Sequence, residues 1–233
     1  MGCLGSTPAK QVPAVDPKPA HQDKFWLEPT SNDGRVKLEN GDTLAKGSVD
    51  GRIYVAHANS KDKTTRYWFK VNPGLNKVCD FKMGAHHLSK EHDEHGNEFW
   101  AIDDNWTINL ANGAAVKECY VADKEEYMRE NKTVSNFKAK GGDIVMIEIR
   151  GNDLSFWIDN KEVGPKVFSD KELNGESVHV LVDFEKTDGD TVQYFGYDEL
   201  PLNEPAYKPA VVGPVKGKTP PPKPAPKPAP KKK

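Results

Sequence analysis

Apolar and polar residues alternate along a series of short runs in the middle of the chain. Tyr67, Phe69 and Val71 alternate with Trp68 and Lys70, and the same period recurs in other runs. A period of two is typical of a strand with one buried face. Segments rich in Gly, Asn and Asp separate the runs, as turns do. The runs span residues 52–58, 64–71, 77–85, 97–103, 105–110, 143–149, 153–159, 177–184 and 190–197. We therefore predict an all-β fold, an antiparallel sandwich of two sheets.

Three regions of different composition divide the chain. Residues 1–24 are rich in Pro, Ala and Lys without apolar periodicity, so we expect a disordered N-terminal segment. Residues 25–207 contain every Trp, Phe and Tyr and should form the sandwich domain. Residues 208–233 are largely Pro, Lys and Ala, which favours an extended, disordered basic tail. Residues 122–137 have a helix-like, polar composition, and we expect a loop with a short helix there.

Charge and cysteine content narrow the function classes. The net charge is -2, yet residues 208–233 carry eight Lys and no acid, so the body of the protein is acidic. An acidic body argues against nucleic-acid binding. The cysteines Cys3, Cys79 and Cys119 are too few and too far apart for a disulfide framework or a zinc motif, and we expect Cys79 and Cys119 to be buried free thiols. We find neither an apolar stretch of membrane-spanning length nor a signal-peptide region.

The segment from Gly141 to Phe168, GGDIVMIEIRGNDLSFWIDNKEVGPKVF, resembles the C-terminal half of SPRY domains. Residues 67–71, 78–84, 177–184 and 191–195 are similar to further strands of that family, as is the strand around Trp100. The resemblance covers residues 25 to 200, and it implies a bent, concanavalin-like jelly roll with aromatic residues between its sheets. Residues 159–162 depart from the family's Asn-Gly turn, and the PRY extension is not recognisable. The expected core residues are Trp68 or its neighbours Tyr67 and Phe69, with Phe81, Trp100, Phe156, Val180 and Phe184.

The same resemblance implies that loops at one end of the sandwich bind a peptide or a folded protein. We expect the binding rim in three loops, residues 59–63, 86–97 and 185–190. The candidate partner-binding residues are Asn59, Asp62, Lys63, His92, His95, Glu185, Lys186, Asp188 and Asp190.

Two of these loops also have residues that suit other chemistries. His86, His87, His92 and His95 supply imidazoles at a density that suits a transition metal, but their spacing fits no zinc signature, so we expect a solvated loop and no metal. Asp183, Asp188 and Asp190 surround a Gly as in calcium loops, which keeps open a sugar-binding jelly roll with a calcium-assisted site. We find neither a nucleophile elbow nor a phosphate-binding loop, and expect a non-enzyme without a cofactor.

The two ends of the chain suggest where the protein acts. Gly2 and Ser6 satisfy the spelling for N-myristoylation, and Cys3 is placed for palmitoylation, the second signal that stable attachment requires. The basic tail would suit an acidic surface, including the cytoskeleton, or a Src-homology 3 or WW-type domain. We therefore expect an adaptor on the cytoplasmic face of a membrane, such as the plasma or ciliary membrane. A sugar-binding domain and a cytoskeletal or ciliary structural protein are the alternatives.

Overall fold

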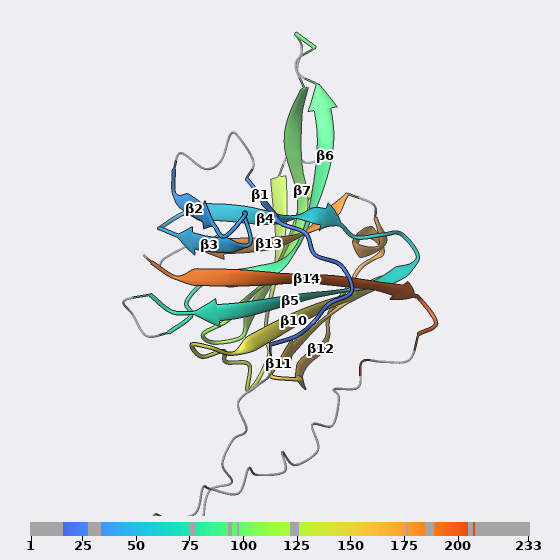
Figure 1. Ribbon diagram of the computed structural model, residues 1–233. Helices are drawn as coiled ribbons and strands as arrows, with labels where there is room; N and C mark the ends of the chain where they lie inside the picture. The colour runs from blue at the N-terminus through green and yellow to red at the C-terminus, as the bar shows by residue number, and fades with distance from the viewer. Residues whose placement is uncertain are drawn as a thin grey trace, which may run out of the picture.

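The computed structural model describes residues 16–27, 34–74, 78–92, 95–96, 98–121, 126–175, 177–184, 189–204 and 207, with the backbone alone for 89–92, 98–103, 120 and 121. Within these residues, fourteen strands form two antiparallel sheets of seven strands each (Figure 1). The first sheet has the order β1 (Phe25–Trp26), β4 (Gly51–Ala58), β13 (Val178–Phe184), β6 (Lys82–His92), β7 (Glu98–Asn109), β8 (Ala114–Val121), β9 (Glu126–Thr133). The second has the order β12 (Lys161–Ser169), β11 (Asp153–Ile158), β10 (Ile144–Arg150), β5 (Lys63–Asn72), β14 (Thr191–Pro201), β3 (Leu44–Gly47), β2 (Val36–Glu39). The predicted two-sheet sandwich is confirmed.

The alternation of side chains in the second sheet places one set of residues in the core. Tyr67 pairs with Ile147, and Ile147 pairs with Phe156, across β5, β10 and β11. All three are fully buried between the sheets. Burial of an apolar side chain of this size stabilises the fold by about 1.5–3 kcal/mol. The expected core residues Phe69, Phe81, Val180 and Phe184 are buried in the same cluster, and the side chain of Trp100 lies outside the described residues.

Trp68 is buried in a second cluster, on the outer face of the same sheet. It pairs with Met146, which pairs with Trp157, so the three side chains share the face opposite to the core. Tyr207, beyond the end of β14, packs edge-on against Trp157, with 5.0 Å between the ring centroids. Tyr207 thus covers an apolar patch that the outer face of the sheet would otherwise expose.

Residues 16–24 differ from the expected disordered segment. His21 and Tyr197 of β14 exchange two backbone hydrogen bonds of 3.0 Å, and their rings stack with centroids 5.0 Å apart. Asp16 accepts a hydrogen bond from the Lys70 Nζ atom on neighbouring β5, at 3.2 Å. The described part of the N-terminal segment therefore lies along the second sheet. The sequence did not predict this docking, because the segment is polar and backbone hydrogen bonds require no apolar periodicity.

Residues 126–133 form a strand, β9, so the expected short helix is wrong for this segment. β9 pairs with β8 along its whole length, from Ala114–Thr133 to Val121–Glu126. It lies at the edge of the first sheet, and nearly all its residues are exposed. An edge strand with two solvated faces needs no apolar alternation, because backbone hydrogen bonds to its neighbour hold it in place.

Two other departures concern strand lengths and a turn. The runs 97–103 and 105–110 join into the single strand β7, and β6 begins at Lys82 and not at residue 77. β7 and β6 form a hairpin that extends beyond the rest of the sandwich (Figure 1). In the turn between β11 and β12, Asp159 and Asn160 have φ values of 47° and 63°. Two left-handed residues make a type I′ turn, so Asp-Asn serves here as Asn-Gly does elsewhere.

No helix among the described residues is long and apolar enough to cross a membrane.

Candidate functional site

Strand register decides which loops share an end of the sandwich. Ala58 of β4 pairs with His179 at the start of β13, and Lys63 of β5 pairs with Pro201 at the end of β14. The loop between β4 and β5 therefore lies beside the short 3-10 helix η2 (Lys171–Asn174), which precedes β13, and beside the residues that follow β14. We call this end of the sandwich the helix end.

The helix end contains a pocket of about 660 Å³. It is framed by the turn between β10 and β11, the end of β12, η2 and the residues after β14. Its lining is polar and charged apart from Leu202 and a glycine, and Leu202 is 43% exposed. The lining residues are Arg150, Gly151, Asn152, Asp153, Ser169, Asp170, Lys171, Asn174 and Leu202. This volume is in the range of sites that hold a small ligand or a short segment of a partner.

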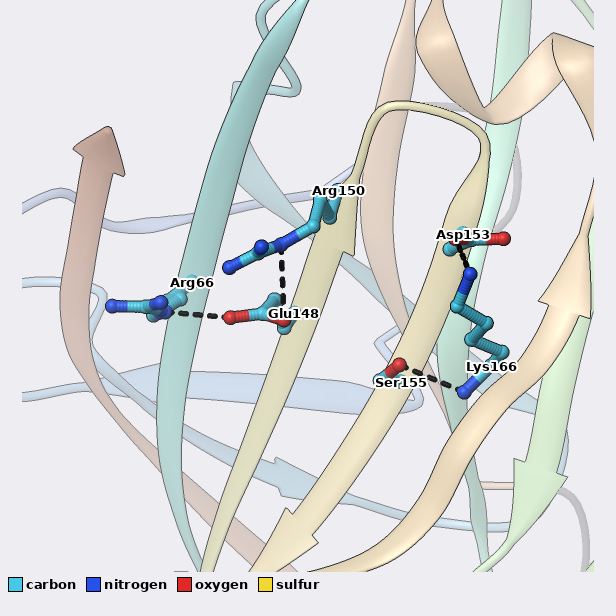
Figure 2. Close-up of polar contacts among 6 residues, drawn as sticks. All are labelled: Arg66, Glu148, Arg150, Asp153, Ser155 and Lys166. Atoms are coloured by element: carbon cyan, nitrogen blue, oxygen red, sulfur yellow. Dashed lines mark hydrogen bonds and ion pairs between the residues drawn. The ribbon is translucent and has the colours of Figure 1, made fainter. Parts of the chain in front are cut away.

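Arg150 is held at the pocket by a row of charges on the outer face of the second sheet. Its Nε atom lies 3.6 Å from Oε1 of Glu148, whose Oε2 accepts a hydrogen bond of 2.7 Å from Arg66 Nε. Figure 2 shows Glu148 between the two arginines, which come from neighbouring strands. Glu148 is buried, so the contacts with two cations compensate for the loss of its hydration.

Asp153 faces the pocket from the other side of the same turn. Its Oδ1 accepts a hydrogen bond of 2.6 Å from Ser169 Oγ, and its Oδ2 lies 2.8 Å from Lys166 Nζ. The backbone of Lys166 also donates to Ser155 Oγ at 2.9 Å (Figure 2). Burial acts to raise the pKa of Asp153, but the hydrogen bonds from Lys166 and Ser169 outweigh it and leave the pKa below its ordinary value. Asp153 is therefore charged at neutral pH.

Asp170 is the N-cap of η2 and a junction between the two sheets. It accepts hydrogen bonds from the backbone of Glu172 at 3.2 Å and from Trp106 Nε1 at 3.3 Å, and it pairs with Lys117 of β8. Burial acts to raise its pKa, but the hydrogen bonds from Lys117, Glu172 and Trp106 lower the pKa overall. A fixed carboxylate at this position anchors η2, and with it the floor of the pocket.

The loop that precedes β5 closes the helix end. The Asp62 backbone donates to Asn174 Oδ1 at 2.8 Å, and Asn174 Nδ2 donates back to Asp62 Oδ1 at 2.9 Å. This reciprocal pair joins the predicted rim loop to a residue that lines the pocket. Lys63 is half-exposed and lies 3.9 Å from Glu199, between Nζ and Oε1.

Asn59 and Asp190 are corrections to the predicted rim, because both are buried. Asn59 is 1% exposed and donates through Nδ2 to the Leu173 carbonyl oxygen at 3.0 Å, so it fixes η2. Asp190 is fully buried and accepts a hydrogen bond from the Gly74 backbone. Both side chains form hydrogen bonds inside the protein and are not accessible to a partner.

The three predicted loops do not meet at one end. Asn72 pairs with Thr191, so Asp190 lies at the end opposite to Lys63. His92 ends β6, where only the backbone is described, and His95 is exposed in the β6–β7 turn. The candidate residues Glu185, Lys186 and Asp188 lie outside the described residues, as do Gly2, Cys3 and the tail 208–233.

The metal and nucleophile chemistries find no support in the described residues. His86 and His87 are consecutive in β6, so their imidazoles point to opposite faces of the sheet. Within the described residues, no group of three or more His, Cys, Asp or Glu side chains could hold a metal ion. Cys79 is a buried free thiol, and burial raises its pKa to about 12, which removes it as a nucleophile at neutral pH. Cys119, also free, is only partly buried.

Sequence patterns did not single out Arg150, Asp153 or Asn174 as site residues. The first two flank the tight turn of residues 150–153, within the segment whose pattern indicates a fold and not a binding site. Asn174 lies in a helix of four residues with no apolar period of its own. They gather at one pocket because of long-range strand pairing, and no local spacing records that pairing.

Comparison with known proteins yields fold likenesses alone. No family model and no curated protein sequence matches the chain. Among solved structures, the chain is similar to the SPRY domain of human HERC1: the identity is 14%, the match covers 69% of this chain and 92% of that one, and the TM-score is 0.47. The chain is also similar to the carbohydrate-binding module CBM66 of Bacillus subtilis, with an identity of 10% and a TM-score of 0.39. That match covers 79% of this chain and 99% of the module. A third similar structure is an alginate lyase of Pseudomonas aeruginosa, with an identity of 8% and a TM-score of 0.33. That match covers 64% of this chain and 73% of the lyase. At these identities and TM-scores, none of the three indicates a ligand, a partner or a reaction for this chain.

Proposed function

We propose that this protein is a non-enzymatic adaptor, tethered to a membrane, that holds a segment of a partner protein in the helix-end pocket. The observation that carries the proposal is the way the pocket is built. The charged side chains of Arg150, Asp153 and Asp170 are held in place by ion pairs with neighbouring residues. Asn152 and Leu202 are exposed at the rim of the pocket. Fixed polar groups with an apolar contact beside them suit a peptide that bears both kinds of side chain.

The protonation states of the pocket acids support binding over catalysis. The pKa values of Asp153 and Asp170 both lie below the ordinary range because of their hydrogen-bond donors. A general acid needs a pKa near the operating pH. These two carboxylates are charged at neutral pH, so they suit electrostatic recognition of a cationic or hydrogen-bond-donating partner group.

Partner binding can be tested by photo-crosslinking in cells. A photoreactive amino acid replaces Asn152 at the pocket, and the matched control replaces Lys138, which is exposed near the opposite end. We expect discrete adducts from position 152 that are absent at position 138, and a second substitution, Leu202→Asp, should reduce their yield. Equal adduct patterns at both positions, or no effect of Leu202→Asp, would contradict the proposed pocket.

The membrane tether rests on the N-terminal spelling, which lies outside the described residues. Gly2 would carry a myristoyl chain and Cys3 a palmitoyl chain, which together give stable attachment to the cytoplasmic face. The test is fractionation of the wild type, Gly2→Ala and Cys3→Ser, with intact-mass measurement of each. Both variants should move to the soluble fraction and lose acyl mass. A Gly2→Ala protein that stays on membranes, with a native mass lacking an acyl group, would refute the tether.

A further inference from the structure

The outer face of the first sheet carries a row of polar side chains. Cross-strand pairs join His86 to Asn105, Asn105 to Glu118, and Glu118 to Arg129. These residues lie side by side on β6, β7, β8 and β9, and they share one face of the sheet. Ala85, the neighbour of His86 along β6, belongs to the core, so the row faces away from the second sheet.

This row lines a polar pocket of about 140 Å³. Six strands contribute to its wall: β4, β13, β6, β7, β8 and β9. None of its residues lines the helix-end pocket, so the two are separate sites. The lining residues are Arg52, Lys82, His86, Asn105, Thr107, Glu118, Arg129, Leu181 and Asp183. The volume is well below that of sites for drug-sized ligands, which fits a ligand of a single small ring.

His86 is the least satisfied polar side chain in this pocket. It is 1% exposed, and no described residue lies within hydrogen-bonding reach of either ring nitrogen. Its one described ring contact is with Tyr54, edge-on, with 5.4 Å between centroids. A buried polar group left without a partner costs about 1–3 kcal/mol. Such a cost in a pocket wall suggests that the partner is a ligand.

The imidazole of His86 is neutral. Burial lowers its pKa to about 3, with a smaller effect from the positive charge of Arg52. A neutral imidazole offers one donor and one acceptor. Hydroxyl groups match this pair, because each hydroxyl donates one hydrogen bond and accepts others.

Charges around the pocket argue against an anionic ligand. Arg52 Nε already pairs with Asp183 Oδ2 at 3.1 Å, and Arg129 Nε lies 3.6 Å from Glu118 Oε1. Lys82 is a third cation in the lining, so a phosphate would meet two carboxylates, Asp183 and Glu118, among three cations, and both arginines are already paired with these carboxylates. Asn105 Nδ2 donates to Glu118 Oε2 at 2.8 Å, which leaves its amide oxygen to accept from a ligand hydroxyl.

We propose that this pocket binds one neutral sugar unit, with His86 as the central hydrogen-bonding group and Asn105 and Arg129 at its side. The site is independent of the helix-end pocket, so the adaptor proposal and the sugar site stand or fall separately.

The test is ligand-observed NMR and calorimetry on the full chain with D-glucose, D-galactose, D-mannose and N-acetyl-D-glucosamine, each alone, and with inorganic phosphate as a separate probe. We expect at least one sugar to bind with a Kd in the millimolar range, equivalent to about -4 kcal/mol. His86→Phe keeps the ring volume and removes both nitrogens, so it should raise that Kd at least about tenfold. His21→Phe, the same substitution at an exposed position on the other sheet, should leave the Kd unchanged.

Arg129→Met covers the case in which His86→Phe does not fold, because Arg129 lies on an exposed edge strand. It should also weaken sugar binding. The proposal is overturned if none of the four sugars binds, if phosphate binds more tightly than every sugar, or if both pocket variants bind as the wild type does.

Discussion

The Nε atom of Arg66 lies 2.7 Å from Oε2 of Glu148, and each side chain is less than a tenth exposed. The pair joins β5 to β10 on the outer face of the second sheet, where Arg150 adds a second cation (Figure 2). The charged row continues into the wall of the helix-end pocket. Stability and the position of a binding residue are therefore linked through one carboxylate.

Arg66→Met should be strongly destabilising, because it leaves Glu148 buried beside a single, more distant cation. Removal of one partner from a buried ion pair costs about 3–5 kcal/mol. The control is Lys166→Met, which removes the partner of Asp153, since the Lys166 side chain is 70% exposed. An exposed pair of that kind contributes about 0–1 kcal/mol. Urea denaturation of the three proteins measures both values, and similar losses for the two variants would contradict the role of burial.

Tyr207 should protect the outer apolar cluster, because its ring packs on Trp157 and its hydroxyl donates to Asn160 Oδ1 at 2.8 Å. Tyr207→Ala should expose the Trp157 indole, shift tryptophan emission to longer wavelength and cost about 1–2 kcal/mol. Tyr207→Phe keeps the ring and loses one hydrogen bond, so it should cost about 1 kcal/mol with little spectral change. An unchanged emission spectrum in Tyr207→Ala would show that Tyr207 does not cover the cluster.

The sequence predicted the strands that have one buried face and missed those that do not. The alternation around Tyr67 and Phe156 reflects a core on one side of the second sheet, so it was visible in the sequence. β9 has no buried face, and its polar composition was therefore interpreted as a helix. The Asp159–Asn160 turn lacks Gly, but both residue types tolerate the left-handed backbone, and the hairpin forms as expected.

The candidate sites were less predictable than the fold, because they depend on register. Asp62 was singled out and lies at the helix end, where it bonds to Asn174 from a distant part of the chain. Asp190 appeared equivalent in the sequence, yet the pairing of β14 with β5 places it at the other end. Asn59 is of a residue type common in exposed loops, but η2 covers its side chain. The spacing of these residues along the chain does not indicate which of them lie close together in the fold.

Stability should fall as the pH drops below about 6.5, the ordinary pKa of histidine. Burial lowers the pKa of His86 to about 3, so between these values the unfolded chain binds a proton that the folded chain does not. The free energy of unfolding then decreases with falling pH by up to about 1.4 kcal/mol per pH unit. His57 and His179 also have lowered pKa values, chiefly because of burial, and act in the same direction.

The contribution of His86 is isolated by comparing the wild type with His86→Phe in denaturation series between pH 4 and pH 7. The slope should be smaller in the variant. Asp153 and Asp170 also lose stabilisation as the pH falls through the ordinary Asp pKa, because their folded pKa values are lowered, but they do so equally in both proteins and cancel in the comparison. Equal slopes in the two proteins would show that His86 is not held neutral by the fold.

Gly196 should be the residue that allows the N-terminal segment to dock on β14. Its φ is +128°, and a Cβ atom there would lie 2.1 Å from the His21 carbonyl oxygen. Gly196→Ala should therefore displace residues 16–24 and speed trypsin cleavage after Lys24, while the sandwich itself persists. Gly189→Ala is the matched control, because Gly189 also has a positive φ, +83°, but no atom of the described residues lies closer than 3.9 Å to its added Cβ. Limited trypsin digestion with mass mapping of the cleavage sites measures the difference. Early cleavage after Lys24 in Gly196→Ala alone is the expected result, whereas equal cleavage rates in both variants would contradict a docking role for the close approach of Gly196 and His21.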